Sequence, residues 1–175
     1  VKLVESPFYP EGGGQVTDAG TITAPGLRAR VTGAVRLGDD QILTVEIDEG
    51  EIETGMEVET RVDRNARFAT ATHHTATHLL HAALREKLGG HVRQAGSAVR
   101  PDKLRFDFTH GKALSADELV WVEDRVNGWI ADNEPVHAIN TSRDEAEKLG
   151  AMALFGEKYG EWVRMVEVGG GQAAV

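Results

Sequence analysis

The hydrophobic pattern of the sequence changes its period near Asp63, and this change limits the possible folds more than any other feature. Before this point, short runs rich in Val, Ile and Thr alternate with turns that contain Gly, which is typical of β-strands. After it, apolar residues recur at helical spacing over residues 68–88 and 119–130. The sequence therefore predicts an α+β protein, with a β-rich subdomain at residues 1–62 and an α+β subdomain at residues 63–175.

Turn and cap residues define several of the expected elements. The Gly38-Asp39-Asp40 segment predicts a hairpin turn between strands at residues 28–37 and 42–47. Ser115 and Glu118 have the spacing of a capping box, which predicts a helix that starts after Ser115. Further strands are expected at residues 21–23, 57–62, 104–108, 136–139 and 162–168, and a short helix at residues 142–149. The short strands and tight turns of the first subdomain suggest a small barrel or sandwich.

Composition excludes several classes of protein. The chain has 175 residues, a formal net charge of −9 and no cysteine. Without cysteine it cannot form disulfides, use a thiolate nucleophile or bind zinc through its own sulfur atoms. No apolar run approaches the roughly 20 residues that a membrane helix needs, and the N-terminal residues lack the pattern of a signal peptide. We therefore expect a cytoplasmic protein that does not associate with membranes.

Three histidines follow helical spacing within residues 68–88. His74 and His78 lie four residues apart, so their rings share a helix face and can bind one metal ion, and His81 extends the stripe. Thr75 stands where zinc proteases of the zincin type carry a glutamate, which argues against a protease. The spacing leaves two interpretations open, a metal site and a solvated polar face. The stripe lies opposite the apolar stripe of the helix, so we expect these rings to lie outside the core on which that stripe packs. The apolar stripe consists of Phe68, Ala69, Ala76, Leu79, Leu80 and Ala83.

A glycine-rich segment is the second candidate for a functional site. Gly12, Gly13 and Gly14 precede Gln15, and glycine permits positive φ angles and close approach of a ligand to the main-chain N–H groups. No Gly-Lys-Ser/Thr sequence follows, so this is not a phosphate-binding P-loop. The segment predicts either a cradle for a carboxylate, a carbonyl oxygen or a terminal ribose, or a flexible hairpin loop.

A polar segment and a group of cations follow the long predicted helix. Gln94 and Ser97 flank Gly96, either as part of a binding site or within a simple helix-to-strand connector. A local basic surface on an acidic protein can bind a polyanion, although scattered surface ion pairs explain the charges equally well. The cations of this region are Arg85, Lys87, Arg93, Arg100, Lys103 and Arg105, and a second group contains Arg61, Arg64 and Arg67.

Taken in order, these segments resemble the editing domain of alanyl-tRNA synthetase and the related free-standing alanyl-tRNA editing proteins. The similar stretches are PFYPEGGGQ at residues 7–15, HTATHLLHAAL at 74–84, HVRQAGS at 91–97, LRFDF at 104–108 and GAMALFGEKYG at 150–160. The resemblance covers nearly the whole chain. It implies a small β-barrel-like part joined to an α+β part that carries a His-x-x-x-His helix. It also implies proofreading in protein biosynthesis, by hydrolysis of the ester that links serine or glycine to alanine tRNA.

The resemblance also implies a cofactor and a set of site residues. In the family, zinc is held by a His-x-x-x-His pair and a later Cys-x-x-x-His pair. The first pair corresponds to His74 and His78, whereas the second has no counterpart, because the chain has no cysteine and no histidine after His137. We expect His74, His78 and Gln94 to act in catalysis. We expect substrate contacts from Gly12, Gly13, Gly14, Gln15, Gln94 and Ser97.

The expected partners are mischarged alanine tRNA and, if this is an excised domain, the rest of the synthetase polypeptide. The six cations between Arg85 and Arg105 are expected to contact the tRNA backbone. Two other functions stay open. One is a module that binds the tRNA acceptor end without catalysis, which the missing second ligand pair favours. The other is an unrelated metallohydrolase that acts on a small substrate.

Overall fold

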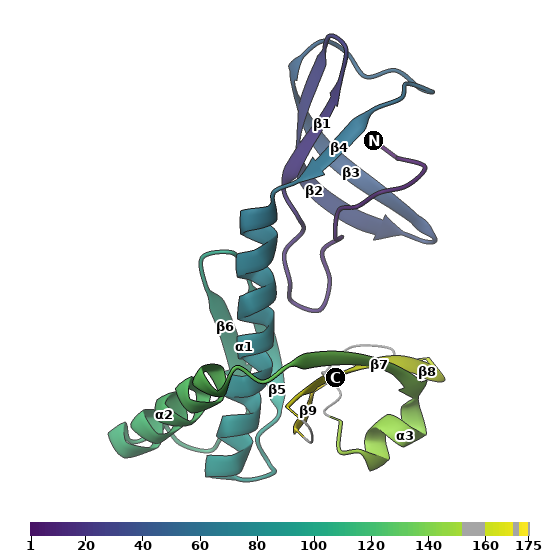
Figure 1. Cartoon of the computed structure of the whole chain (residues 1–175). Coiled ribbons are helices and arrows are strands. Elements are labelled where there is room, and N and C mark those ends of the chain that lie inside the picture. Colours follow the sequence, from purple (N-terminus) through teal and green to yellow (C-terminus); the bar gives the residue numbers. More distant parts are fainter. Residues whose placement is uncertain (152–159, 170–171, 175) are drawn as a thin grey trace. The chain divides into compact units, whose positions relative to one another are not determined.

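The computed structural model describes residues 1–151, 160–169 and 172–174, and it divides into two compact units (Figure 1). The first unit contains Val1–His74 and Ser97–Arg105, and the second contains Thr75–Gly96 and Phe106–Val175. Helix α1 (Arg64–Leu88) and strand β5 (Gln94–Val99) each contribute residues to both units. The subdomain boundary expected after residue 62 stays a prediction, because compactness alone does not show which part folds or functions independently.

The first unit is built on one antiparallel sheet (Figure 1). Its strands are β1 (Gly20–Ala24), β2 (Leu27–Leu37), β3 (Asp40–Glu49) and β4 (Glu59–Val62), in the order β3-β2-β1-β4. The predicted hairpin turn is confirmed between β2 and β3. The barrel-like prediction is wrong, since β3 and β4 do not pair with each other within the described residues. A barrel requires its edge strands to pair, and here the edge strand β4 has only 4 residues.

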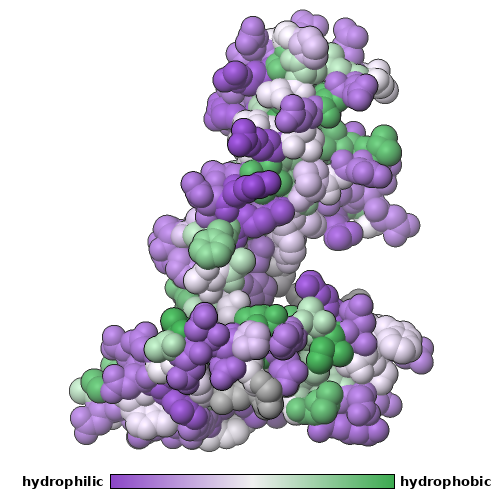
Figure 2. Space-filling model, viewed as in Figure 1, coloured by the Kyte–Doolittle hydropathy of each residue, from purple (hydrophilic) through white to green (hydrophobic). Residues whose placement is uncertain are grey.

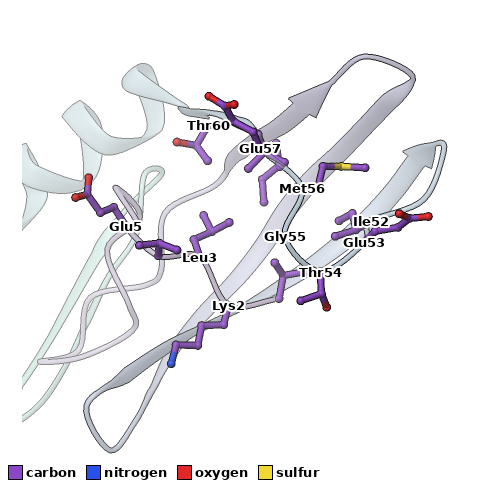
Figure 3. Close-up of a pocket in the computed structure, with 14 residues that line it drawn as sticks. Lys2, Leu3, Glu5, Ile52, Glu53, Thr54, Gly55, Met56, Glu57 and Thr60 are labelled. Carbon is purple, nitrogen blue, oxygen red and sulfur yellow. The ribbon is translucent and has the colours of Figure 1, made fainter.

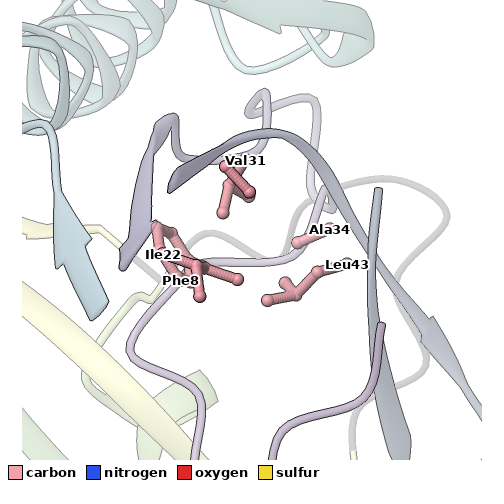
Figure 4. Close-up of a cluster of buried hydrophobic side chains, with 6 residues drawn as sticks. Phe8, Ile22, Val31, Ala34 and Leu43 are labelled. Atoms are coloured by element: carbon pink, nitrogen blue, oxygen red, sulfur yellow. The ribbon is translucent and has the colours of Figure 1, made fainter. Parts of the chain in front are cut away.

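The core of the first unit follows the alternation of β2. Leu27, Ala29 and Val31 are buried between exposed neighbours, as the period of two requires. A register shift between Val31 and Gly33 then moves the next buried position to Ala34. Figure 2 shows a mostly hydrophilic surface over this sheet, with apolar side chains scattered on it. The buried cluster consists of Phe8, Ile22, Ala29, Val31, Ala34 and Leu43 (Figure 4).

The second unit packs the C-terminal half of α1 against α2 (Ala116–Asp132) and part of β6 (Leu104–Phe108). The predicted capping box is confirmed at the start of α2. The Ser115 N–H donates to Glu118 Oε2 at 2.8 Å, and the Glu118 N–H donates to Ser115 Oγ at 3.2 Å. The helix ends at Asn133, whose left-handed φ of 47° closes it. The buried cluster consists of Ala83, Leu84, Val92 and Val122.

Besides the two-stranded sheet of β5 and β6, the described residues contain a three-stranded antiparallel sheet, which completes this unit. It contains β7 (Val136–Ser142), β8 (Trp162–Val168) and β9 (Gln172–Ala174) in that order, and α3 (Arg143–Lys148) follows β7. The expected strand over residues 162–168 is confirmed, and Ser142 caps α3. Residues 152–159, which carry much of the last family-like stretch, lie outside the described residues. No described helix is both long enough and apolar enough to cross a membrane.

Candidate functional site

The glycine-rich segment forms a tight, ordered turn in the first unit. Gly12 and Gln15 exchange backbone hydrogen bonds, with N–O distances of 3.2 and 2.9 Å. Between them, Gly13 and Gly14 have φ angles of 58° and 78°, the two positive values that a type I′ turn requires. Among the described residues, the amides of Gly13 and Gly14 have no hydrogen-bond acceptor. The turn therefore presents two adjacent N–H donors.

Strand β5 holds this turn in place. The Gly14 carbonyl accepts from the Val99 N–H at 2.8 Å, and the Val16 N–H donates to the Val99 carbonyl at 3.1 Å. The contact needs glycine, because a Cβ at position 14 would lie 2.8 Å from the Ser97 carbonyl oxygen and still closer to Ser97 Oγ. The hairpin expected as one interpretation of residues 12–15 is confirmed, and the cradle stays a prediction. The connector interpretation of residues 91–97 is wrong in part, because β5 starts at Gln94.

The turn brings Gln15 to the first histidine of the predicted pair. His74 Nδ1 and Gln15 Oε1 lie 2.6 Å apart, a short hydrogen bond in which the amide oxygen accepts. The neighbouring His73 Nδ1 lies 2.7 Å from the Arg100 carbonyl oxygen. Both rings are thus fixed through Nδ1, by acceptors from different parts of the first unit.

The structure corrects the predicted position of the histidine stripe. His78 and His81 are only 9% and 5% exposed, whereas Phe68, from the predicted apolar stripe, is 76% exposed. The C-terminal half of α1 is covered on more than one side, since Leu79 and Leu84 are buried as well. Helical spacing alone cannot distinguish such a helix from an amphipathic one, because the pattern does not show how many neighbours the helix has.

His81 is a buried imidazole without a matching polar neighbour. Its ring lies 5.1 Å from the ring of Phe106, and neither ring nitrogen has a hydrogen-bond partner among the described residues. Burial lowers the pKa of His81, and the charge of Arg85 lowers it further. The nearby Val92 backbone raises the pKa and so opposes part of this shift, although its geometry does not meet the criteria for a hydrogen bond. His81 is therefore neutral at pH 7.

The described residues do not complete a zinc site. Structural zinc sites use four protein ligands and catalytic sites usually three. His74 and His78 lie one helical turn apart in α1, but no group of three His, Asp or Glu side chains that could hold a metal ion occurs in the described part of the chain. The His-x-x-x-His spacing is thus not confirmed as a metal motif, and its zinc remains a prediction.

The remaining predicted residues are divided between the two units. Gln94 belongs to the second unit, and Ser97 lies beside the glycine turn in the first. Arg85 Nη1 donates to the Val92 carbonyl at 3.1 Å and so stabilises the turn after α1. The Lys87 ammonium lies 5.0 Å from the centre of the Trp121 ring. Arg85, Lys87 and Arg93 belong to the second unit, and Arg100, Lys103 and Arg105 to the first.

One charged pair that supports the site has no signal in the sequence. Asp18 is buried, accepts the Tyr9 N–H at 2.6 Å and pairs with Arg67 of α1. The Arg67 guanidinium also donates to the Pro7 carbonyl at 2.6 Å. Both flanks of the glycine turn are therefore tied to α1. No local pattern marks Asp18, because its partner lies 49 residues away.

A separate cavity of about 760 Å³ opens in the first unit (Figure 3). Its walls come from residues 1–5 and 52–58, with Ile22 and Thr60. Leu3, Ile52 and Val58 of these walls also pack on the buried cluster of the sheet. None of the predicted site residues lines this cavity, so it is not the candidate site.

Comparisons with known proteins agree with the motifs. The family model described as tRNA synthetases class II (A) matches residues 1–66. The alanine–tRNA ligase of Halorhodospira halophila is 52% identical over 169 residues, which cover 97% of this chain and 20% of that protein. The chain is similar to one segment of alanine–tRNA ligases. Those of Acetivibrio thermocellus and Thermotoga maritima are each 51% identical, over 97% of this chain and 19% and 20% of their own lengths.

The similarity to alanine–tRNA ligases extends over both units. The family model ends within the first turn of α1, whereas the ligases match nearly all of the chain, from the glycine turn through α1 and β5. The chain spans about a fifth of the length of these curated relatives. The similarity therefore concerns one segment of a much larger enzyme.

Proposed function

We propose that the chain hydrolyses the ester that joins serine or glycine to the 3′ end of alanine tRNA. The observation that carries this proposal is the ordered Gly12–Gln15 turn, held on β5 with Gln15 bonded to His74, in a chain similar to alanine–tRNA ligases. Such an activity meets a physical need. A site that selects alanine cannot strongly reject the smaller glycine or serine with its added hydroxyl, so a second hydrolytic site supplies the accuracy.

The turn offers what ester hydrolysis requires. Water attacks the ester carbonyl carbon, negative charge develops on the carbonyl oxygen, and the bond to the tRNA 3′ oxygen then breaks. Two fixed N–H donors stabilise such an oxyanion without reorganisation. The Gly13 and Gly14 amides provide this pair, and His74 positions the water from the helix that faces Gln15. Gln94 and Ser97 contact the amino acid and the terminal adenosine in this proposal.

Zinc has a limited place in the proposal. His74 and His78 would be two of its ligands, and the ion would polarise a water or orient the substrate amino group. The described residues supply no third ligand, so no step of the hydrolysis is assigned to the ion. The tRNA backbone is the proposed partner of the cations at Arg93, Arg100 and Lys103. The longer ligase polypeptide is the proposed covalent context.

The test measures release of serine from serine-charged alanine tRNA by the purified chain. We expect release well above the rate without protein, and a loss of about 100-fold or more when His74 and His78 are both changed to Ala. His137, which is exposed on β7, provides the matched control, and H137A should keep full activity. Full activity in the double variant would remove these histidines from the mechanism. No release by the wild-type chain would reject hydrolysis.

A second function is favoured by the incomplete ligand set of the described residues. In this alternative, the chain binds the acceptor end of tRNA without catalysis. Binding of uncharged alanine tRNA that weakens steeply with salt, together with no release of serine, would support it. Release of serine at the same rate from a short ester without tRNA would instead favour a metallohydrolase for small substrates.

A further inference from the structure

We infer that Gln15 is a positioning residue, whose side-chain oxygen holds His74 in the tautomer that carries its proton on Nδ1. This tautomer places the lone pair of the ring on Nε2. The chemical consequence rests on the proposed hydrolysis, whereas the tautomer itself follows from the contact alone. Gln15 was expected from the sequence to line a substrate pocket, and the structure gives its side chain a different task.

The backbone of Gln15 is fixed on both sides. Its N–H donates to the Gly12 carbonyl at 2.9 Å within the type I′ turn. Its neighbours Gly14 and Val16 each bond to Val99 of β5, so Gln15 and Val99 form a parallel bridge. Because the backbone is anchored, only the side-chain torsions of Gln15 remain to be fixed when its amide reaches His74.

The atoms in contact decide which of them is the donor. Gln15 Oε1 lies 2.6 Å from His74 Nδ1, and an amide oxygen has no proton to give. The ring nitrogen must therefore be the donor. In the other neutral tautomer, two lone pairs would face each other at this distance. In metal sites, partners of this kind fix the tautomer and the orientation of the histidine, and their loss typically lowers metal affinity or activity by about 10–100-fold.

His73 provides a control within the same chain. His73 Nδ1 lies 2.7 Å from the carbonyl oxygen of Arg100, which also can only accept. His73 should therefore hold the same tautomer as His74. Its acceptor belongs to the main chain, so no substitution of Gln15 removes it. A change confined to His74 thus reports the loss of one hydrogen bond rather than loss of the fold.

The direct experiment is NMR of the full chain with ¹⁵N-labelled histidine, in which long-range ¹H–¹⁵N couplings report the protonated nitrogen of each ring. We expect Nδ1–H on both His73 and His74 in the wild-type protein. Gln15→Met, which keeps the length but lacks the acceptor, should shift His74 toward a mixture of tautomers and leave His73 unchanged. Gln15→Glu, which keeps an acceptor oxygen, should restore Nδ1–H on His74. A proton on Nε2 of wild-type His74, or an unchanged His74 in Gln15→Met, would overturn the inference.

Kinetics then separate this inference from the proposed function. We expect Gln15→Met to lower kcat for serine release by about 10-fold or more with little change in KM, and Gln15→Glu to restore most of kcat. Equal kcat in all three proteins would overturn the positioning role. If the wild-type chain releases no serine while His74 shows the expected tautomer, the proposed function fails and the assignment of Gln15 stands.

Discussion

The two compact units differ in how they treat buried polar groups. In the first unit, buried Asp18 has three donors around it, from Tyr9 and from the guanidinium of Arg67. In the second unit, His81 is at least as deeply buried, yet neither of its nitrogens has a partner among the described residues. An unsatisfied buried group costs free energy that a satisfied group does not.

The two units therefore use their buried polar groups differently. In the first unit, hydrogen bonds fix the glycine turn and one histidine, so that Gln15 and His74 lie at a defined distance. The second unit keeps a neutral imidazole in an apolar setting next to Phe106. A buried neutral imidazole makes the free energy of unfolding depend on pH. The buried core of the first unit contains no histidine, so it should not add such a dependence.

The largest expected effect is on the apolar core of the first unit. Leu43 is 2% exposed, and Leu43→Ala should lower the free energy of unfolding by about 2–5 kcal/mol, because it removes buried contacts and leaves a cavity. Leu37, at the end of the β2–β3 hairpin, is 71% exposed, and L37A should change it by less than about 0.5 kcal/mol. Urea unfolding measures both. Equal effects would show that the sheet is not the stable part of this unit.

The next effect tests the contact between the glycine turn and β5. Gly14→Ala places a Cβ against Ser97 and keeps a φ of 78°, whereas Gly26→Ala at a φ of 75° meets nothing within 4 Å. Positive φ destabilises both variants. G14A should lower the free energy of unfolding by about 1–3 kcal/mol more than G26A, because its Cβ overpacks against Ser97. G14A should also slow serine release, unlike G26A. Matching unfolding curves for the two variants would mean that the turn can move away from Ser97.

The third prediction concerns pH and the second unit. The folded-state pKa of His81 is lowered by burial, so the unfolded chain binds a proton that the folded chain refuses. Its stabilising contribution is therefore complete above the unfolded pKa of about 6.5 and is lost as the pH falls from there toward the folded pKa. Urea midpoints at pH 8, 7, 6 and 5 should decline less in His81→Leu than in wild type. The control His137→Leu should decline like wild type, and parallel curves for H81L and wild type would contradict the assignment.

The smallest effect tests a feature that sequence and structure share. Ser115→Ala removes one half of the capping box of α2 and should lower the free energy of unfolding by about 0.5–2 kcal/mol. Ser115→Asp, which still accepts from the Glu118 N–H, should recover most of this loss. Amide exchange in the first turn of α2 would show the change. No difference between the two substitutions would mean that the box adds nothing beyond the helix itself.

Local signals in the sequence predict most elements but few of their contacts. The turn at Gly38, the capping box at Ser115 and the strand over residues 162–168 depend on neighbouring residues, and all three are confirmed. Helix α1 starts at Arg64 rather than at residue 68, because the Asp63 carboxylate accepts from the Asn65 and Ala66 amides. Polar residues at that start hide it from a search for apolar periodicity.

Long-range contacts could not be predicted in the same way. Gln15 and His74 are 59 residues apart, and no local sequence pattern indicates that the glycine turn contacts α1. The apolar stripe of α1 indicated one buried side, whereas the second unit covers several sides and encloses His81. The prediction of a barrel is wrong for the same reason, since the length of β4 and the pairing of its free edge are properties of the assembled sheet.

The decisive experiment compares the release of serine and of alanine from the same alanine tRNA by the purified chain. A proofreading hydrolase must spare the correct ester, so we predict release of serine at least about 10-fold faster than release of alanine, at rates well above those without protein. Equal rates for the two esters, or no release of either, would rule out a proofreading hydrolase.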